Sequence, residues 1–258
     1  YSDLVVQWRQ RFPFRFNLYL DNSGLESTGR YMGTLTLSYD HALTLNDLLY
    51  VSLNHSLLEP FPAPRGAAGG VFHYSLPYGP WLLGATINHS HYRQPVPSIA
   101  GTTIYSGNSG GLELRLSRLL MRDAHSKTSA YLSLWSRQSR NYIADLEIAV
   151  QRREVSGWEA GVTHRQRLGH ATLDLNAGYR RGTGIFGSHR LPNEASEGST
   201  QPQLLQLGAL YNLPFAVGEQ RLRYSLALRA QRASTSLLAQ DRFSIGSRFS
   251  VRVFNDQR

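Results

Sequence analysis

Hydrophobic and polar residues alternate one by one along most of the chain. In the stretch 14–21, four large apolar residues (Phe14, Phe16, Leu18 and Leu20) are separated by single polar or less apolar ones. The same alternation recurs at 34–39, 49–54, 112–117, 130–135, 173–178 and 222–229. Neighbouring side chains of a β-strand point to opposite faces, so each stretch is predicted to be a strand with one apolar and one polar face.

Turn-forming residues separate these stretches. Glycine, proline, asparagine and aspartate gather at 21–24, 60–70, 78–80 and 182–202. Helical periodicity is nearly absent, and about eleven strand-like stretches follow one another at this spacing. No linker divides the chain. The sequence therefore predicts a single all-β domain over residues 1–258, with strands and loops at 13–240.

Two architectures share this alternation. In a soluble sandwich the apolar face forms a core, whereas in an outer-membrane barrel it meets lipid and the polar face lines a wet interior. The polar positions here carry many charges, including the neighbours Glu113 and Arg115, and the apolar positions are rich in leucine. Aromatic residues lie near the ends of several stretches, as in the aromatic girdles of membrane barrels. These features favour an antiparallel transmembrane β-barrel, while a soluble all-β binding domain remains the alternative.

Composition narrows the classes of function. The formal charge is +9, but the arginines are spread over the whole sequence without a dense basic run, so we expect no nucleic-acid partner. The chain has no cysteine, which excludes disulfides and thiolate metal sites. No window reaches about 18 consecutive apolar residues, so no transmembrane helix is expected.

No set of residues has the pattern of a catalytic, cofactor or metal site. His89 and His91 share a strand face, but two ligands are too few for a metal. Asp145 and Glu147 are better interpreted as charges lining a polar interior than as paired catalytic acids. The glycines of 182–187 precede a polar loop rather than a helix, which argues against a dinucleotide fingerprint. We therefore expect neither an enzyme nor a bound cofactor.

The last eighteen residues, 241–258, form a distinct stretch in which aromatic and aliphatic residues alternate with charged ones. Arg252 lies between two valines and is followed two residues later by Phe254. An isolated buried charge is very costly, so Arg252 needs a carboxylate or a wet cavity. We interpret the stretch as a loop that folds into the interior of a pore. Its candidate site residues are Asp241, Arg242, Phe243, Gly246, Val251, Arg252, Val253 and Phe254.

Four stretches together resemble a known family. They are Leu20-Asp-Asn-Ser-Gly24 followed by Thr28-Gly29, Leu45-Asn-Asp-Leu-Leu-Tyr-Val51, Tyr74-Ser-Leu-Pro-Tyr-Gly-Pro-Trp81, and Asp241-Arg-Phe-Ser-Ile-Gly246 with Ser250-Val-Arg-Val-Phe254. In order and spacing they resemble the barrel region of the two-partner secretion transporters of Gram-negative outer membranes, the hemolysin-activator and filamentous-hemagglutinin transporter group within the Omp85 superfamily. The resemblance spans essentially the whole chain.

The resemblance implies a barrel of sixteen antiparallel strands preceded by periplasmic POTRA domains. On that basis we expect residues 13–240 to form about strands one to eleven, and 241–258 to begin the sixth extracellular loop, with POTRA domains and later strands absent. In the family this loop folds inward, and its arginine pairs with an aspartate on a later strand. Arg252 and Phe254 match the family's tip, whereas Val253 replaces a glycine that would permit a backbone turn.

The expected function follows from the resemblance. It implies a component of a protein-translocating pore in the Gram-negative outer membrane, which exports a large β-rich exoprotein of the hemolysin or adhesin type. Its other contacts would be outer-membrane lipid and lipopolysaccharide. A small-solute diffusion porin is the alternative with the same architecture. With about eleven strands, the chain by itself is expected to form an open, curved sheet with unpaired edges.

Overall fold

A computed structural model describes residues 12–22, 24–58, 64–99, 101–185, 198–238 and 241–242. The described residues contain twelve strands and one short 3-10 helix, η1 (Ala149–Gln151). The strands are β1 (Phe14–Asp21), β2 (Tyr31–Asp40), β3 (Leu48–Leu57), β4 (Gly66–Tyr78), β5 (Trp81–Ser98), β6 (Gly101–Arg122), β7 (Ser126–Ile143), β8 (Leu146–Glu147), β9 (Arg153–Leu168), β10 (Ala171–Thr183), β11 (Gln203–Val217) and β12 (Gln220–Ala233). No helix in this described part is long and apolar enough to cross a membrane.

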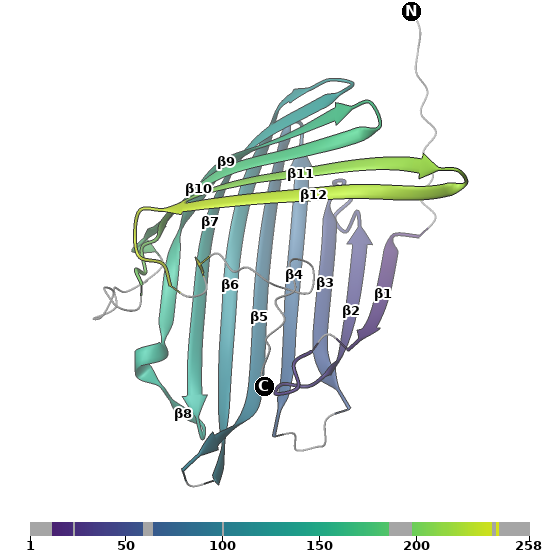
Figure 1. Cartoon of the computed structure of the whole chain (residues 1–258). Helices are drawn as coiled ribbons and strands as arrows, with labels where there is room; N and C mark the ends of the chain where they lie inside the picture. Colours follow the sequence, from purple (N-terminus) through teal and green to yellow (C-terminus); the bar gives the residue numbers. More distant parts are fainter. Residues whose placement is uncertain are drawn as a thin grey trace, which may run out of the picture.

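All twelve strands belong to one sheet, in which each long strand pairs with its neighbours in the sequence. The order is β1-β2-β3-β4-β5-β6-β7-β9-β10-β11-β12, and the two-residue β8 pairs only with β7. Every pairing is antiparallel, as the first and last pairs illustrate. The sheet curls, so that β11 and β12 pass across the front of the view while β2 to β7 run behind them (Figure 1). Within the described residues β1 and β12 remain its two edges. The predicted all-β, open, curved sheet is confirmed.

The register places like residues on the same face. On the outer face Leu114 is opposite Leu134, and Leu116 is opposite Leu132. On the inner face Glu113 is opposite Trp135, which in turn is opposite Gly157 of β9. The alternation seen in the sequence therefore separates a leucine-rich outer face from a polar inner face, because adjacent strands are aligned in phase.

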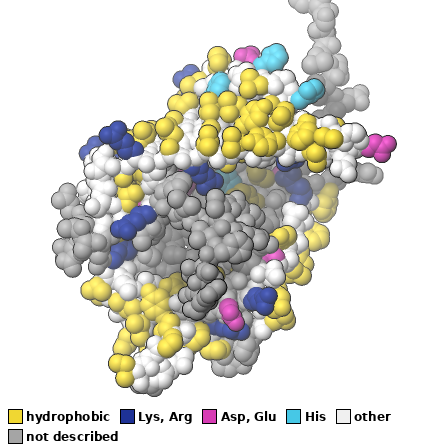
Figure 2. All heavy atoms as spheres, in the orientation of Figure 1, with side chains coloured by type: hydrophobic (Ala, Val, Ile, Leu, Met, Phe, Trp, Pro, Cys, Tyr) yellow, Lys and Arg dark blue, Asp and Glu magenta, His cyan; other side chains and the backbone are white. Residues whose placement is uncertain are grey.

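The outer face has no layer packed against it within the described residues. Leu132, Leu207 and Leu228 are 50%, 46% and 60% exposed, whereas Trp135, Val155, Ala171, Leu204 and Leu238 are the buried hydrophobic residues of the described part. Hydrophobic side chains gather over β11 and β12 in Figure 2. Soluble proteins rarely expose so large an apolar surface, and lipid is the solvent that suits it. This argues against the soluble binding domain.

The two ends of the sheet differ in their connections. At one end the strands are joined by short turns, such as those at Gly79, Gly169 and Gly218, whose φ angles of 55°, 61° and 61° favour glycine. At the other end lie longer loops, including the connections over 22–30, 144–152 and 184–202. Outer-membrane barrels turn their short connections to the periplasm and their long ones to the outside. We call these the short-turn end and the long-loop end.

Candidate functional site on the concave wall

The inner face of β6, β7, β9 and β10 carries a connected set of charged and aromatic side chains. The Tyr131 hydroxyl donates to Glu159 Oε1 at 2.8 Å, and Arg180 Nε donates to the other oxygen of Glu159 at 2.6 Å. The guanidinium carbon of Arg115 lies 3.6 Å from the centre of the Tyr131 ring. Each of these charges thus has an opposite charge or an aromatic face within contact distance. Such contacts lower the free-energy cost of placing charged side chains on a wall that is partly shielded from water.

Two glycines make room for this arrangement. A Cβ atom added at Gly161 would lie 2.6 Å from the Tyr131 ring, and one added at Gly178 would lie 2.8 Å from the Tyr131 hydroxyl. Only a residue without a side chain therefore lets Tyr131 lie flat across β9 and reach Glu159. The two glycines and the tyrosine therefore fit one another at this point of the wall.

Towards the long-loop end, Trp135 is the centre of a small buried cluster. The Trp135 side chain is 5% exposed and packs with Val155 of β9 and with Leu238, which follows β12. The guanidinium carbons of Arg137 and Arg180 lie 5.0 and 5.3 Å from the centre of its ring. Two cations thus flank one indole, an arrangement that the negative face of the ring favours.

The segment after β12 crosses to this cluster. Asp241 has 3% of its side chain exposed, and its Oδ1 lies 3.1 Å from Arg137 Nη2. The Gln231 side chain donates to the Asp241 carbonyl at 2.7 Å, and Arg242 Nε donates to the Leu237 carbonyl at 3.1 Å. The described residues of segment 234–242, which are 234–238 and 241–242, follow the last strand and lie on the concave side of the sheet (Figure 1). Asp241 is therefore bound to a strand that precedes it by about a hundred residues.

Two buried polar atoms of the cluster have no hydrogen-bond partner. They are the second carboxylate oxygen of Asp241, Oδ2, and the indole nitrogen of Trp135, Nε1. One is an acceptor and the other is a donor, and both belong to side chains that are almost fully buried. Buried polar groups are paired in most proteins, so these two atoms are an unsatisfied acceptor and an unsatisfied donor within one cluster.

The short-turn end of the same wall is held differently. Arg165 of β9 pairs with Asp174 of β10, and their side chains are 66% and 29% exposed. At the turn between β6 and β7, Asp123 Oδ1 accepts from the amides of His125 and Ser126 at 2.7 and 2.6 Å, and its Oδ2 accepts from the Ser126 hydroxyl at 2.7 Å. The hydrogen bond from the Ser126 hydroxyl contributes most to lowering the pKa of Asp123, and the bonds from the two amides lower it further. Here the contacts are local and open to solvent.

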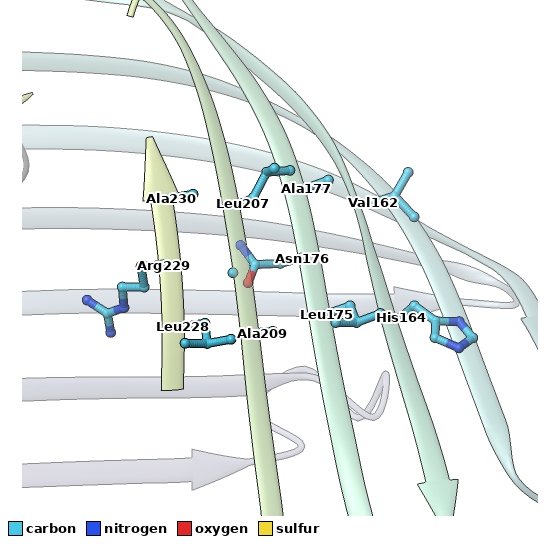
Figure 3. Close-up of a pocket in the computed structure, with 11 residues that line it drawn as sticks. Val162, His164, Leu175, Asn176, Ala177, Leu207, Ala209, Leu228, Arg229 and Ala230 are labelled. Atoms are coloured by element: carbon cyan, nitrogen blue, oxygen red, sulfur yellow. The ribbon is translucent and has the colours of Figure 1, made fainter. Parts of the chain in front are cut away.

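A shallow apolar depression lies on the outer face, over β9 to β12. It is lined by Leu175, Leu207 and Leu228 together with small residues such as Ala177 and Ala209. Figure 3 shows Val162 and His164 on one side of the strands, while the Arg229 side chain extends to the other. The depression thus belongs to the leucine-rich outer face and is separate from the polar wall on the inner face.

Of the residues that the sequence singled out, Asp241 and Arg242 are described, and Asp241 pairs with Arg137 beside the Trp135 cluster. The other six candidates, Phe243, Gly246, Val251, Arg252, Val253 and Phe254, lie outside the described residues. Sequence reasoning did not find Trp135 or Arg137. Alternation does place both on the polar face of β7, but nothing in the sequence indicates that Asp241 binds there. Among the described residues, no group of three or more metal-binding side chains comes together.

A single-layered sheet with a lipid-suited outer face and a charged inner face is the wall of an outer-membrane β-barrel. The whole chain, residues 1–258, matches the profile of the family described as "Haemolysin secretion/activation protein ShlB/FhaC/HecB". The protein therefore belongs to this family of outer-membrane transporters.

The similar proteins are much longer than this chain. It is 30% identical over 258 residues to the "Outer membrane transporter CdiB-2" of Burkholderia pseudomallei (strain 1026b), covering 99% of this chain and 44% of that protein. Among solved structures, CdiB from Escherichia coli matches with a TM-score of 0.88 and 25% identity, over 97% of this chain and 46% of that one. CdiB from Acinetobacter baumannii matches with a TM-score of 0.77 and 34% identity, over 94% and 42%. The chain spans about half the length of the curated relatives that it matches.

Proposed function

We propose that this chain forms part of the wall of a protein-conducting pore that exports an exoprotein by two-partner secretion. The observation that carries the proposal is the polar concave wall, whose charges are paired with one another or stacked on aromatic rings. A conduit must stay hydrated, yet it must hold a passing chain weakly enough to release it. Paired charges such as these meet both needs, because they attract water and each already has a partner that competes with the passenger.

The family supports the same function. Relatives of this chain carry the names outer membrane transporter and hemolysin transporter protein. By analogy, the passenger of the present protein is a secreted polypeptide of the hemolysin or adhesin type. The apolar outer face would contact membrane lipid and, in the outer leaflet, lipopolysaccharide. Each edge of the sheet, β1 and β12, would be paired with a further strand in the membrane, since lipid offers no partner to a free backbone group.

Residues 241–258 are proposed as the start of a loop that folds into this pore, following strands and loops at 13–240. Asp241 in contact with Arg137 supports an inward path for the first residues of the stretch. Its tip would carry Arg252, which needs an opposite charge in the interior, flanked by Val251 and Val253 and followed by Phe254. In this proposal Phe243 and Gly246 belong to the limb that leads inward. None of these residues is assigned covalent chemistry, and the protein is proposed to be a conduit rather than an enzyme.

Secretion in living cells tests the proposal. The full-length protein is expressed together with a candidate exoprotein from the same organism, in a Gram-negative host that lacks both, and exoprotein is measured in the medium. We expect export with the wild type and strongly reduced export with Arg252→Ala at equal amounts of barrel in the membrane. Solute uptake without any export would favour a diffusion porin instead. Normal export by Arg252→Ala would remove the anchoring role of that arginine while leaving the transport function intact.

A further inference from the structure

The two cations that flank Trp135 form a receptor for a carboxylate, which we call the carboxylate cradle (Trp135, Arg137 and Arg180). Arg180 is already neutralised within the wall, since Glu159 of the neighbouring strand accepts its hydrogen bond at 2.6 Å. Arg137 is different, because among the described residues Asp241 is the one acidic side chain within ion-pair distance of it. The charge balance of the cradle therefore depends on a carboxylate that does not come from the wall.

That carboxylate comes from the residues that follow the last strand, of which 234–238 and 241–242 are described. Residues 234–238 are held by backbone hydrogen bonds to Gln203 and Ser199, by an isolated bridge between Leu237 and Ser199, and by the burial of Leu238. Asp241 itself is held by its amide bond to the Leu238 carbonyl at 2.9 Å and by the Gln231 side chain, outside any described strand ladder. Asp241 can thus leave Arg137 without breaking any pairing between strands.

The bound state of Asp241 is also incomplete. Its Oδ2 and the Trp135 Nε1 are buried without hydrogen-bond partners in the described structure. An unpaired buried donor and acceptor weaken the docked state relative to one in which both are satisfied. The cradle therefore holds Asp241 less tightly than its burial suggests, and a carboxylate that satisfied the indole N–H would compete with it.

We propose that the carboxylate cradle is a binding site for acidic side chains of the polypeptide in transit, and that Asp241 is the internal ligand that occupies it between transits. The proposal rests on the transport function proposed above. Exchange of one carboxylate for another leaves Arg137 paired before and after, so the free energy changes little as the passenger enters and leaves. The wall thereby offers a weak binding site that does not trap the passing chain, as a conduit requires.

Competition at equilibrium tests the site. A short fluorescein-labelled peptide of alternating glutamate and glycine is titrated with purified full-length protein in detergent, and binding is followed by fluorescence anisotropy. In Asp241→Asn the internal competitor is lost, and the affinity should rise roughly tenfold if the wild-type cradle is free about a tenth of the time. Arg137→Gln should abolish this gain in the Asp241→Asn background, whereas Arg137→Lys, which keeps the charge, should retain part of it.

The controls use the other ion pair of the same wall and different ligands. Asp174→Asn should leave the affinity unchanged, because its carboxylate pairs with Arg165 and does not contact the cradle. A glutamine–glycine peptide should bind equally to wild type and Asp241→Asn. An unchanged affinity in Asp241→Asn or an equal gain for the neutral peptide would each overturn the proposal.

Failure of the inference and failure of the function are distinguishable. If the wild type exports its exoprotein but Asp241→Asn shows no gain in peptide affinity, the cradle is wrong and the transport function stands. If the peptide gain is present but no exoprotein is exported, the cradle binds carboxylates and its role in transit is wrong.

Discussion

The concave wall is held together in two different ways at its two ends. Near the long-loop end, Asp241 is buried against Arg137 and Leu238 packs with Trp135, and the residues in contact are about a hundred positions apart in the sequence. Near the short-turn end, Arg165 pairs with Asp174 on the adjacent strand, and the Arg165 side chain is 66% exposed. Both ends carry arginine–carboxylate pairs on the same face of the same sheet. They differ in burial and in what each pair connects.

The two ends therefore show two kinds of contact. One kind holds a segment in place, and the other adds to strands that their backbone hydrogen bonds already hold together. The ladder between β9 and β10 exists without Arg165 and Asp174, since its backbone pairing runs over the whole length of both strands. The described residues after β12, 234–238 and 241–242, have no such ladder. Single backbone bonds to Gln203 and Ser199 hold the first of them, and Asp241 is positioned against β7 by its side chain. We therefore expect substitutions at the long-loop end to change the position of this segment, and equivalent substitutions at the short-turn end to change little.

The largest effect is expected for Trp135→Ala. It removes the central ring of the buried cluster, and the loss of a buried tryptophan costs about 3–5 kcal/mol. The indole also supports Arg137 and Arg180, so their stacking is lost with it. Segment 234–242 should then open more often, which hydrogen exchange at the amide of Asp241 in the full-length protein would show as faster exchange.

Trp158→Ala is the matched control for that experiment. Trp158 packs against Tyr179 with ring centres 5.8 Å apart and belongs to the outer face, opposite Leu134. Its removal should leave exchange at Asp241 unchanged. Equal acceleration by both substitutions would show that segment 234–242 follows the general stability of the barrel rather than the Trp135 cluster.

A smaller effect is expected for the ion pair between Arg137 and Asp241. In a double-mutant cycle with Arg137→Ala and Asp241→Ala, the coupling free energy should be about 1–3 kcal/mol, because one partner is almost fully buried and the other is one-third exposed. The corresponding cycle with Arg165→Ala and Asp174→Ala should give about 0–1 kcal/mol, the usual range for exposed pairs. Hydrogen exchange measured under identical conditions gives both values. Couplings of equal size would contradict the contrast between the two ends.

The same contrast explains what the sequence could predict. The alternation of leucines at 112–116 and 130–134 predicts two strands with an apolar face, and both stretches lie in β6 and β7 with those faces aligned. The approximate strand count follows from this repeated local pattern, and the open sheet is expected from that count set against the sixteen strands that the resemblance implies. The contact of Asp241 with Arg137 depends instead on how far the sheet curls before the segment after β12 meets β7. That curvature is a sum of small twists between many strands, which no local pattern encodes.

Individual residues illustrate this limit. The motif around Asp241 marks it as a candidate, and the structure places it against Arg137 of β7. Arg137 carries no comparable motif. It is one of several arginines at polar positions of the alternation, and the sequence alone does not distinguish it from Arg165 or Arg115.

The smallest effect is expected at the turn between β6 and β7, where Asp123 accepts bonds from residues within three positions of it. The Ser126 hydroxyl and the amides of His125 and Ser126 lower the pKa of Asp123 in the folded protein. A folded-state pKa below the unfolded value of about 3.9 means that the carboxylate contributes stability above that pH. This contribution is lost as the pH falls through the folded pKa.

Hydrogen exchange of the turn amides, measured between about pH 6 and pH 3 and corrected for the intrinsic rate, should therefore show protection that decreases at the acidic end in the wild type. Asp123→Asn should remove most of this pH dependence while leaving exchange at Asp241 unchanged, because the turn is fixed by its own residues and not by the cluster at the far end of the wall. A change at Asp241 in this variant would show that the two ends are coupled through the strands.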